Sequence, residues 1–132
     1  SAGFQVAAAR NGVEGVQQLL SLSQRPTAII CFNDDIAIGA LHAIKKHGLT
    51  VPDDISVTGF DNIRVAAYMD PPLTTVDQPA YQMGRRAVEV LIQQINRQPL
   101  TRTREILPFS LLERHSRGPV FKPGQVCYSA LP

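Results

Sequence analysis

Hydrophobic residues are distributed along this chain in two different patterns, and each pattern predicts one kind of secondary structure. Over residues 11–23 the apolar side chains Val13, Val16 and Leu20 recur at helical spacing, which predicts an amphipathic helix. Residues 27–32 are instead a continuous apolar run bounded by polar residues, which is typical of a buried strand. This part of the chain is therefore expected to place a helix before a buried strand.

A second amphipathic pattern predicts a helix over residues 36–47. Asp34 or Asp35 is expected to cap its N-terminus, because a carboxylate can accept hydrogen bonds from the free backbone N–H groups of the first turn. Gly48 is expected just beyond its C-terminus, where a left-handed backbone favours glycine. The face that should lie on the sheet carries Ala37, Ala40, Leu41 and Ile44.

The rest of the pattern continues the alternation and predicts an α/β fold. Residues 55–60 are a further apolar strand, so strand, helix and strand follow one another as in a right-handed parallel βαβ unit. A short helix, a strand, a long helix and a last strand are expected over residues 63–70, 73–78, 80–98 and 103–110, with the last strand extended by 111–117. Residues 118–132 lack periodicity and contain proline and glycine, which predicts an irregular tail.

Composition narrows the class of protein. The 132 residues suffice for one ordinary domain, and hydrophobic and charged fractions of 44% and 18% are those of globular proteins. No apolar run approaches the roughly 20 residues of a membrane span, so no membrane partner is expected. Residues 80–132 carry eight Lys/Arg against three Asp/Glu, giving +5. These basic residues are scattered and lack interleaved aromatic residues, which argues against nucleic-acid contact by this chain.

Three polar side chains end or follow apolar strands and are the candidate ligand contacts. Asn33 and Asp61 each come directly after a predicted strand, and Gln78 ends the next one. The carboxyl ends of parallel strands meet at one edge of a sheet, where small ligands bind. Carboxylate and amide groups suit hydroxyl-rich or amide-bearing ligands such as sugars and nucleosides. Turn formation is an equally weighted alternative, because Asn and Asp favour turns with or without a ligand.

Other chemistries fit the sequence less well. Asp34, Asp35 and Asp61 invite comparison with acidic clusters that hold a metal or accept a phosphoryl group, but no lysine ends a later strand, as a response-regulator receiver requires. The three histidines are dispersed, and neither a nucleophile elbow nor a metal-binding motif occurs. Cys31 lies inside an apolar strand and is expected to be a buried structural thiol. We therefore expect no enzyme, no metal and no cofactor.

Four ordered blocks of sequence resemble the LacI/GalR family of transcriptional regulators. They are RPTAIICFNDDIAIGA at residues 25–40, GLTVPDDISVTGFDN at 48–62, PPLTTVDQP at 71–79 and ERHS at 113–116. The resemblance covers about residues 3–117. It implies that residues 1–117 are the C-terminal portion of an effector-binding and dimerisation domain. Such a domain has a periplasmic-binding-protein-like type I fold, present here as a partial doubly wound parallel sheet.

The resemblance also implies roles for individual residues. Asn33, Asp61 and Gln78 are the expected effector contacts, with Phe4 stacking on the ligand and Asp34 acting as a cap and near neighbour. The homodimer interface implied by the family contains Ile38, Tyr68 and Met69. Ile38 already lies off the face of its helix that is expected to pack on the sheet.

The function implied is that of the effector-sensing and dimerisation part of a cytoplasmic bacterial transcriptional repressor, with a sugar or nucleoside-like small molecule as effector. The family's DNA-binding headpiece is not in this chain, so operator DNA is expected to be bound only through that headpiece. In the family the helix over residues 80–98 packs on the first lobe, so its apolar stripe is expected to be exposed here. A fragment of a periplasmic sugar-binding protein is the alternative, and an enzyme is the third interpretation.

Overall fold

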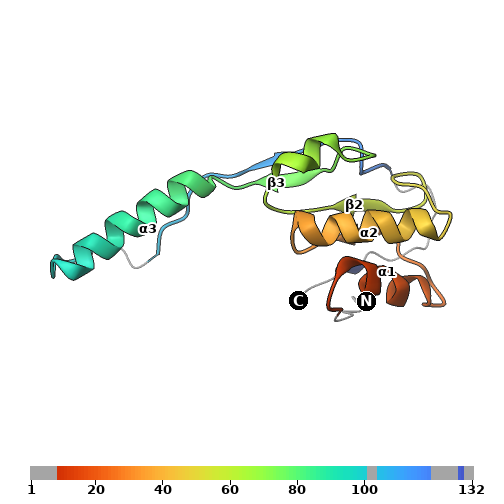
Figure 1. Cartoon of the computed structure of the whole chain (residues 1–132), viewed down its shortest axis with the longest axis horizontal. Helices are drawn as coiled ribbons and strands as arrows, with labels where there is room; N and C mark the ends of the chain where they lie inside the picture. Colours follow the sequence, from red (N-terminus) through yellow and green to blue (C-terminus); the bar gives the residue numbers. More distant parts are fainter. Residues whose placement is uncertain (1–8, 101–103, 120–127, 130–132) are drawn as a thin grey trace.

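The computed structural model describes residues 9–100, 104–119 and 128–129, in which helices and strands alternate as predicted. In chain order the elements are α1 (Gly12–Leu20), β1 (Ala28–Ile30), α2 (Asp34–Lys46), β2 (Ser56–Thr58), the 3₁₀ helix η1 (Arg64–Tyr68), β3 (Thr75–Asp77), α3 (Ala80–Ile95), β4 (Ser110–Leu112) and β5 (Tyr128–Ser129). Figure 1 shows α1, α2 and the strands gathered in one body, from which α3 projects. The predicted α/β fold is confirmed.

The strands form a parallel sheet to which an antiparallel pair is attached. The parallel sheet has the order β2-β1-β5, and Ala28 pairs with Ser56 where β1 and β2 run side by side. A parallel bridge between Thr58 and Thr74 joins β2 to the segment that leads into β3, and β3 pairs with β4 in antiparallel orientation. The predicted βαβ unit is therefore present, and β1, β2 and β3 end near one another.

Helices α1 and α2 pack unusually closely, and a glycine permits it. A Cβ atom added to Gly12 would lie 2.0 Å from the carbonyl oxygen of Ile36 and 2.7 Å from the backbone nitrogen of Ala40. Because these neighbours are backbone atoms of α2, they cannot move aside as a flexible side chain would. Val16 and Leu19 lie on the side of α1 that this close packing buries in the core. Val13 and Leu20, which share the predicted helical spacing with Val16, are partly buried against the same core, and Leu19 was not singled out by that spacing.

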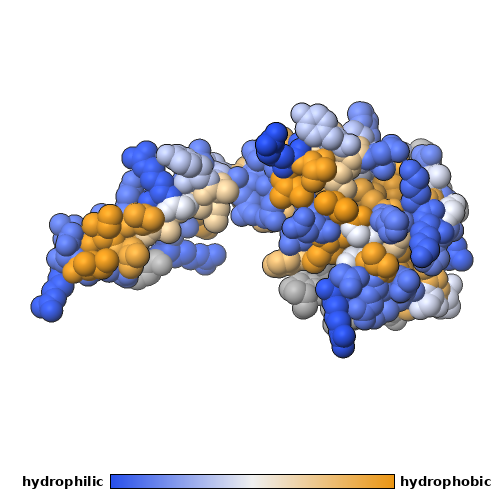
Figure 2. All heavy atoms as spheres, in the orientation of Figure 1, coloured by the Kyte–Doolittle hydropathy of each residue, from blue (hydrophilic) through white to orange (hydrophobic). Residues whose placement is uncertain are grey.

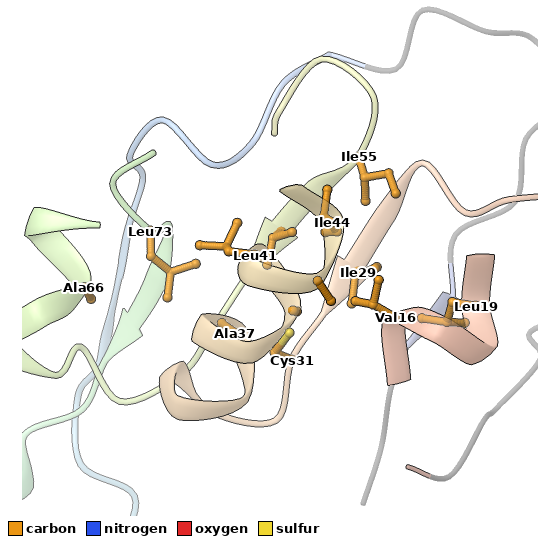
Figure 3. Close-up of a cluster of buried hydrophobic side chains, with 13 residues drawn as sticks. Val16, Leu19, Ile29, Cys31, Ala37, Leu41, Ile44, Ile55, Ala66 and Leu73 are labelled. Carbon is orange, nitrogen blue, oxygen red and sulfur yellow. The ribbon is translucent and has the colours of Figure 1, made fainter. Parts of the chain in front are cut away.

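The core lies between α1, α2 and the sheet, and Figure 3 shows the side chains that fill it. The face of α2 predicted to lie on the sheet is buried, including Ala37 and Ile44, which are fully enclosed. Strands β1 and β2 contribute Ile29 and Val57 from the same side of the sheet. Gly48 follows α2 with a φ of 72°, as predicted for a glycine beyond a helix C-terminus.

Helix α3 contributes no buried residue, and its apolar stripe is exposed, as expected. Val88, Leu91 and Ile95 are 55%, 54% and 70% exposed. Figure 2 shows hydrophobic side chains gathered along this projecting helix. The segment that follows returns beside it, and Arg86 donates to Glu105 at 2.7 Å. None of the described helices is long and apolar enough to cross a membrane.

Two expectations for the last part of the chain were wrong in extent. Of the strand expected over residues 103–110, only residue 110 is in β4, which continues to Leu112 and pairs with the three residues of β3. Residues 104–109 have no regular structure, and 113–117 do not continue the strand but contain a turn at 115–116. Within the tail that was expected to be irregular, residues 128–129 form β5, while 120–127 and 130–132 lie outside the described residues.

Candidate ligand-binding site

The carboxyl ends of β1 and β2 are joined by a backbone hydrogen bond, which brings the first two candidate residues to the same edge of the sheet. The N–H group of Asp34 donates to the carbonyl oxygen of Phe60 at 2.9 Å. Asn33 directly precedes one partner of this bond, and Asp61 directly follows the other. The topology thus places both side chains where parallel sheets bind ligands.

Gln78 joins Asp61 from the end of β3. The backbone N–H of Asp61 donates to the carbonyl oxygen of Val76 at 3.0 Å, so β3 lies beside the end of β2. The side-chain amide of Gln78 donates directly to Oδ1 of Asp61. Two of the three predicted contacts therefore touch each other, and both are half-buried.

The cap of α2 is Asn33, and the prediction that Asp34 or Asp35 would supply it was wrong. Oδ1 of Asn33 accepts a hydrogen bond from the backbone N–H of Ile36 at 2.9 Å. Asn33 has the extended backbone of an N-cap, and its amide nitrogen is a separate donor that capping does not use. Asp34 is instead the first residue of the helix. The sequence alone could not decide between them, because Asn and Asp are about equally good N-caps.

Asp34 is fully buried beneath these strand ends. Its side chain is 0% exposed, and its two oxygens accept hydrogen bonds from the backbone N–H of Ile63 at 2.9 Å and from the hydroxyl of Thr75 at 2.6 Å. Gly59 leaves room for it, since a Cβ atom there would lie 2.1 Å from Oδ1 of Asp34. The glycine of the GFD sequence is therefore explained by the neighbouring carboxylate.

A hydrogen-bonded network holds the turn that carries Asp61. Asp61 and Asn62 have φ values of 112° and 54°, a conformation that Asn and Asp tolerate better than other residues with side chains. The amide of Asn62 donates to Asp77 at 2.9 Å and accepts from the guanidinium of Arg114 at 2.8 Å. Arg114 also donates to the carbonyl oxygen of Leu73 at 2.8 Å.

Sequence reasoning missed this supporting set. Asn62 gave a local signal, because an Asp-Asn pair after a strand is typical of a turn with positive φ. Arg114 gave none, since it lies 52 residues from Asn62 along the chain. Only the pairing of β3 with β4 brings it to the site.

A hollow lies beside the Asp61–Gln78 pair. It has a volume of about 550 Å³ and is lined by Asp61, Asn62, Asp77 and Gln78, and by the aromatic ring of Phe109. A second hollow of about 690 Å³, between α3 and residues 104–109, also includes Gln78 and Phe109, together with Phe60. Both hollows are wide open to solvent, and in volume alone they fall in the range of small-molecule sites. The lining combines hydrogen-bonding groups with exposed aromatic rings, a combination that suits a sugar or a nucleoside.

The remaining expected residues lie away from this edge or outside the described part of the chain. Phe4 belongs to the residues that are not described. Ile38 is 38% exposed on α2, Tyr68 is 86% exposed at the end of η1, and Met69 is half-buried against the core. An ion pair of 3.7 Å between Lys45 and Asp70 places the segment after η1 beside α2.

Metal chemistry and thiol chemistry have little support in the described ranges. Residues 9–100, 104–119 and 128–129 contain no group of three His, Cys, Asp or Glu side chains that could hold a metal ion. Cys31 is buried as predicted, and burial, followed by the charge of Asp34, raises the pKa of its thiol to about 12. Such a thiol is almost entirely protonated at neutral pH and is a poor nucleophile.

Comparison with known proteins places this geometry in a family. Residues 1–117 match the family described as the periplasmic binding protein-like domain. The chain is 50% identical over 84 residues to the ribose operon repressor of Haemophilus influenzae, an alignment that covers 64% of this chain and 25% of that protein. It is 44% identical over 105 residues to the transcriptional repressor CytR of Escherichia coli, covering 80% of this chain and 31% of CytR.

A solved structure has the same fold. The lac repressor dimer bound to operator and the anti-inducer ONPF superposes with a TM-score of 0.73 at 36% identity, over 80% of this chain and 37% of that one. The chain thus spans about a quarter to a third of the length of the curated relatives. The chain belongs to the periplasmic binding protein-like domain family, and it is similar in sequence and in fold to LacI-type regulators.

Proposed function

We propose that this chain is the effector-sensing and dimerisation part of a bacterial transcriptional repressor. The observation that carries the proposal is the contact between Gln78 and Asp61 at the carboxyl edge of the sheet, beside Asn33. These side chains present a carboxylate and two amides within a chain whose relatives are repressors. The same relatives favour a repressor over a periplasmic sugar-binding protein of the same fold.

The expected effector is a sugar or a nucleoside-like molecule. A carboxylate accepts hydrogen bonds from paired hydroxyl groups, while an amide both donates and accepts, so Asp61 and Gln78 together match a vicinal diol. Phe109 lines the adjacent hollow and is 69% exposed, which offers an apolar ring face to the less polar side of a sugar. Phe4 is proposed as a further ring that stacks on the ligand, and Asn33 as the third polar contact.

Control of DNA binding would follow from a difference in affinity. An effector changes operator binding only if it binds the two conformations of the regulator with different affinity, and the coupling is then reciprocal. The operator would be contacted by a headpiece outside this chain, and the parent protein would act in the cytoplasm. Neither a reaction nor a cofactor is part of this mechanism.

A homodimer is the assembly proposed for the parent protein. Its interface would include Ile38, Tyr68 and Met69, because Ile38 and Tyr68 expose large apolar or aromatic surface. The exposed ion pair between Lys45 and Asp70 indicates that α2 and the segment after η1 are neighbours, so that these residues would form one surface. The similar lac repressor structure is itself a dimer.

The proposal is tested on the parent protein by thermal-shift screening against D-ribose, cytidine, adenosine and hypoxanthine. At least one sugar or nucleoside is expected to raise the melting temperature by mass action. The same compound should change binding to operator DNA in a gel-shift assay. Failure of every sugar and nucleoside to bind, or binding with no effect on DNA affinity, would contradict the proposed function.

A further inference from the structure

We propose that Asp34 is a positioning residue of the effector site, whose buried carboxylate fixes the relative placement of the three polar contacts without touching the ligand. The inference rests on the proposed function for its ligand, and on the geometry alone for the positioning. Asp34 is completely enclosed, so direct contact with an effector is not its role.

Three groups of Asp34 bind residues of two other segments. Its backbone N–H donates to the carbonyl oxygen of Phe60, one carboxylate oxygen accepts from the N–H of Ile63, and the other accepts from the hydroxyl of Thr75. Phe60 and Ile63 lie on either side of the turn that follows β2, and Thr75 begins β3. A single residue therefore ties the N-terminus of α2 to that turn and to β3.

Each of these segments carries one proposed contact. Asn33 directly precedes Asp34, Asp61 lies between the two turn residues that Asp34 binds, and Gln78 directly follows β3. A displacement of the Asp34 carboxylate would alter the spacing of all three contacts together. Preorganisation of this kind affects ligand affinity through geometry that no single contact supplies.

The hydrogen bonds of Thr75 fix the direction of its proton. Its hydroxyl oxygen accepts from the backbone N–H of Asn62 at 3.4 Å while its proton is donated to Asp34 at 2.6 Å. Asp34→Asn would place an amide N–H₂ group or an amide oxygen in a site built for two accepting oxygens. At least one donor would then lack an acceptor in a buried site, and the turn carrying Asp61 would lose part of its support.

The test measures binding of D-ribose and cytidine, each titrated calorimetrically into the parent protein and four variants. Asp34→Asn and Thr75→Val are expected to weaken the affinity for whichever probe binds by about tenfold, the scale of a lost hydrogen bond to a charged group. Thr75→Ser keeps the hydroxyl and should remain within about threefold of the wild type. Ile44→Val weakens the same core at the other end of α2 and should leave affinity unchanged.

A double-mutant cycle separates positioning from a general loss of stability. If Asp34 places Gln78, then Gln78→Ala should cost much less affinity in the Asp34→Asn background than in the wild type. Independent effects would be additive. Additive losses, affinity within about threefold for both Asp34→Asn and Thr75→Val, or an equal loss in Ile44→Val would overturn the inference.

Hydrogen exchange of the same proteins gives a readout that needs no ligand. Amides of residues 61–63 should exchange about tenfold faster in Asp34→Asn and Thr75→Val, but not in Thr75→Ser or Ile44→Val. That response, in a protein that binds no sugar or nucleoside of the thermal-shift screen, would support the positioning role while contradicting the proposed function. Unchanged exchange at these amides would overturn the positioning role, whatever the protein binds.

Discussion

The hydroxyl of Ser116 donates a hydrogen bond of 2.6 Å to the backbone carbonyl oxygen of Val57, 59 residues earlier in the chain. The same hydroxyl accepts from the backbone N–H of Thr74 at 2.8 Å. The backbone N–H of Val57 in turn donates to the carbonyl oxygen of Ser116 at 2.8 Å. The segment after β4 thus lies against β2 and the segment that leads into β3, the two segments that continue to Asp61 and Gln78.

Ser116→Ala is therefore expected to destabilise the chain. It removes one donor and one acceptor in a fully buried position and leaves two backbone groups without their partner, which costs about 1–3 kcal/mol in free energy of unfolding. Urea unfolding followed by circular dichroism measures the change. Ser23→Ala, at an exposed position, is the matched control and should lie within about 0.5 kcal/mol of the wild type. Equal stability of the two variants would contradict this account.

The two glycines of α1 should respond oppositely to the same substitution. Gly12→Ala would bring a methyl group to 2.0 Å from a backbone oxygen of α2, so the helices must separate, at a cost of about 1–3 kcal/mol or more. At Gly15 the nearest atom would lie 3.4 Å away, and alanine there should be neutral or stabilising by up to about 1 kcal/mol. Thermal unfolding of both variants checks the prediction, which fails if Gly12→Ala is as stable as Gly15→Ala.

The buried thiol of Cys31 should make the chain less stable at alkaline pH. Burial raises the pKa of its thiol to about 12, whereas an unfolded thiol ionises at about 8.5. The unfolded chain therefore releases the proton first, so the stability contributed by Cys31 is complete below about pH 8.5 and is lost as the pH rises toward 12.

The measurement compares Cys31 with Cys31→Ala, both in a Cys127→Ser background, by urea unfolding at intervals between pH 8 and pH 11. The protein with Cys31 should lose stability relative to Cys31→Ala as the pH rises, so that the difference between their free energies of unfolding decreases. Alkylation of the thiol at pH 8 gives an independent check. The reaction should be slow in the native protein and fast in urea. A difference that stays constant with pH would sink this prediction.

The exposed stripe of α3 predicts self-association of the isolated 132-residue chain. Val88, Leu91 and Ile95 are more than half exposed and form one apolar stripe, which soluble monomers seldom present to water. Sedimentation velocity should reveal dimers or larger species whose fraction rises with concentration. A Leu91→Lys, Ile95→Lys variant keeps good helix formers and should sediment as a monomer. A wild-type chain that is monomeric at all concentrations would be the contrary result.

The sequence predicted the regular elements well where one local signal dominated. The buried face of α2 followed from the spacing of residues such as Ala37 and Ile44, and Gly48 marked its end correctly. Prediction was poorer where a tertiary contact decides. The face of α1 is set by the contact of Gly12 with α2, and β4 is limited by the three residues of β3 available for pairing.

The candidate site shows the same division between local and long-range information. The positions of Asn33 and Asp61 at one edge follow from two consecutive parallel strands, which two apolar runs in the sequence reveal. The cap of α2 was assigned to Asp34 or Asp35 and not to Asn33, because both residue types cap helices and the sequence does not distinguish them. Arg114 was missed, since nothing near it in the sequence indicates the turn that it supports.

The most direct test of the central claim is the affinity of the parent protein for its sugar or nucleoside when Asp61 is replaced by asparagine. Asn tolerates a positive φ, so Asp61→Asn should keep the fold and remove only the charge. Calorimetry is expected to show a roughly 10- to 100-fold weaker affinity, the loss of a hydrogen bond to a charged group, with the melting temperature almost unchanged. Asp53→Asn, at an exposed position in the turn between α2 and β2, should bind like the wild type. Full affinity in Asp61→Asn, or an equal loss in Asp53→Asn, would contradict the assignment of this sheet edge as the effector site.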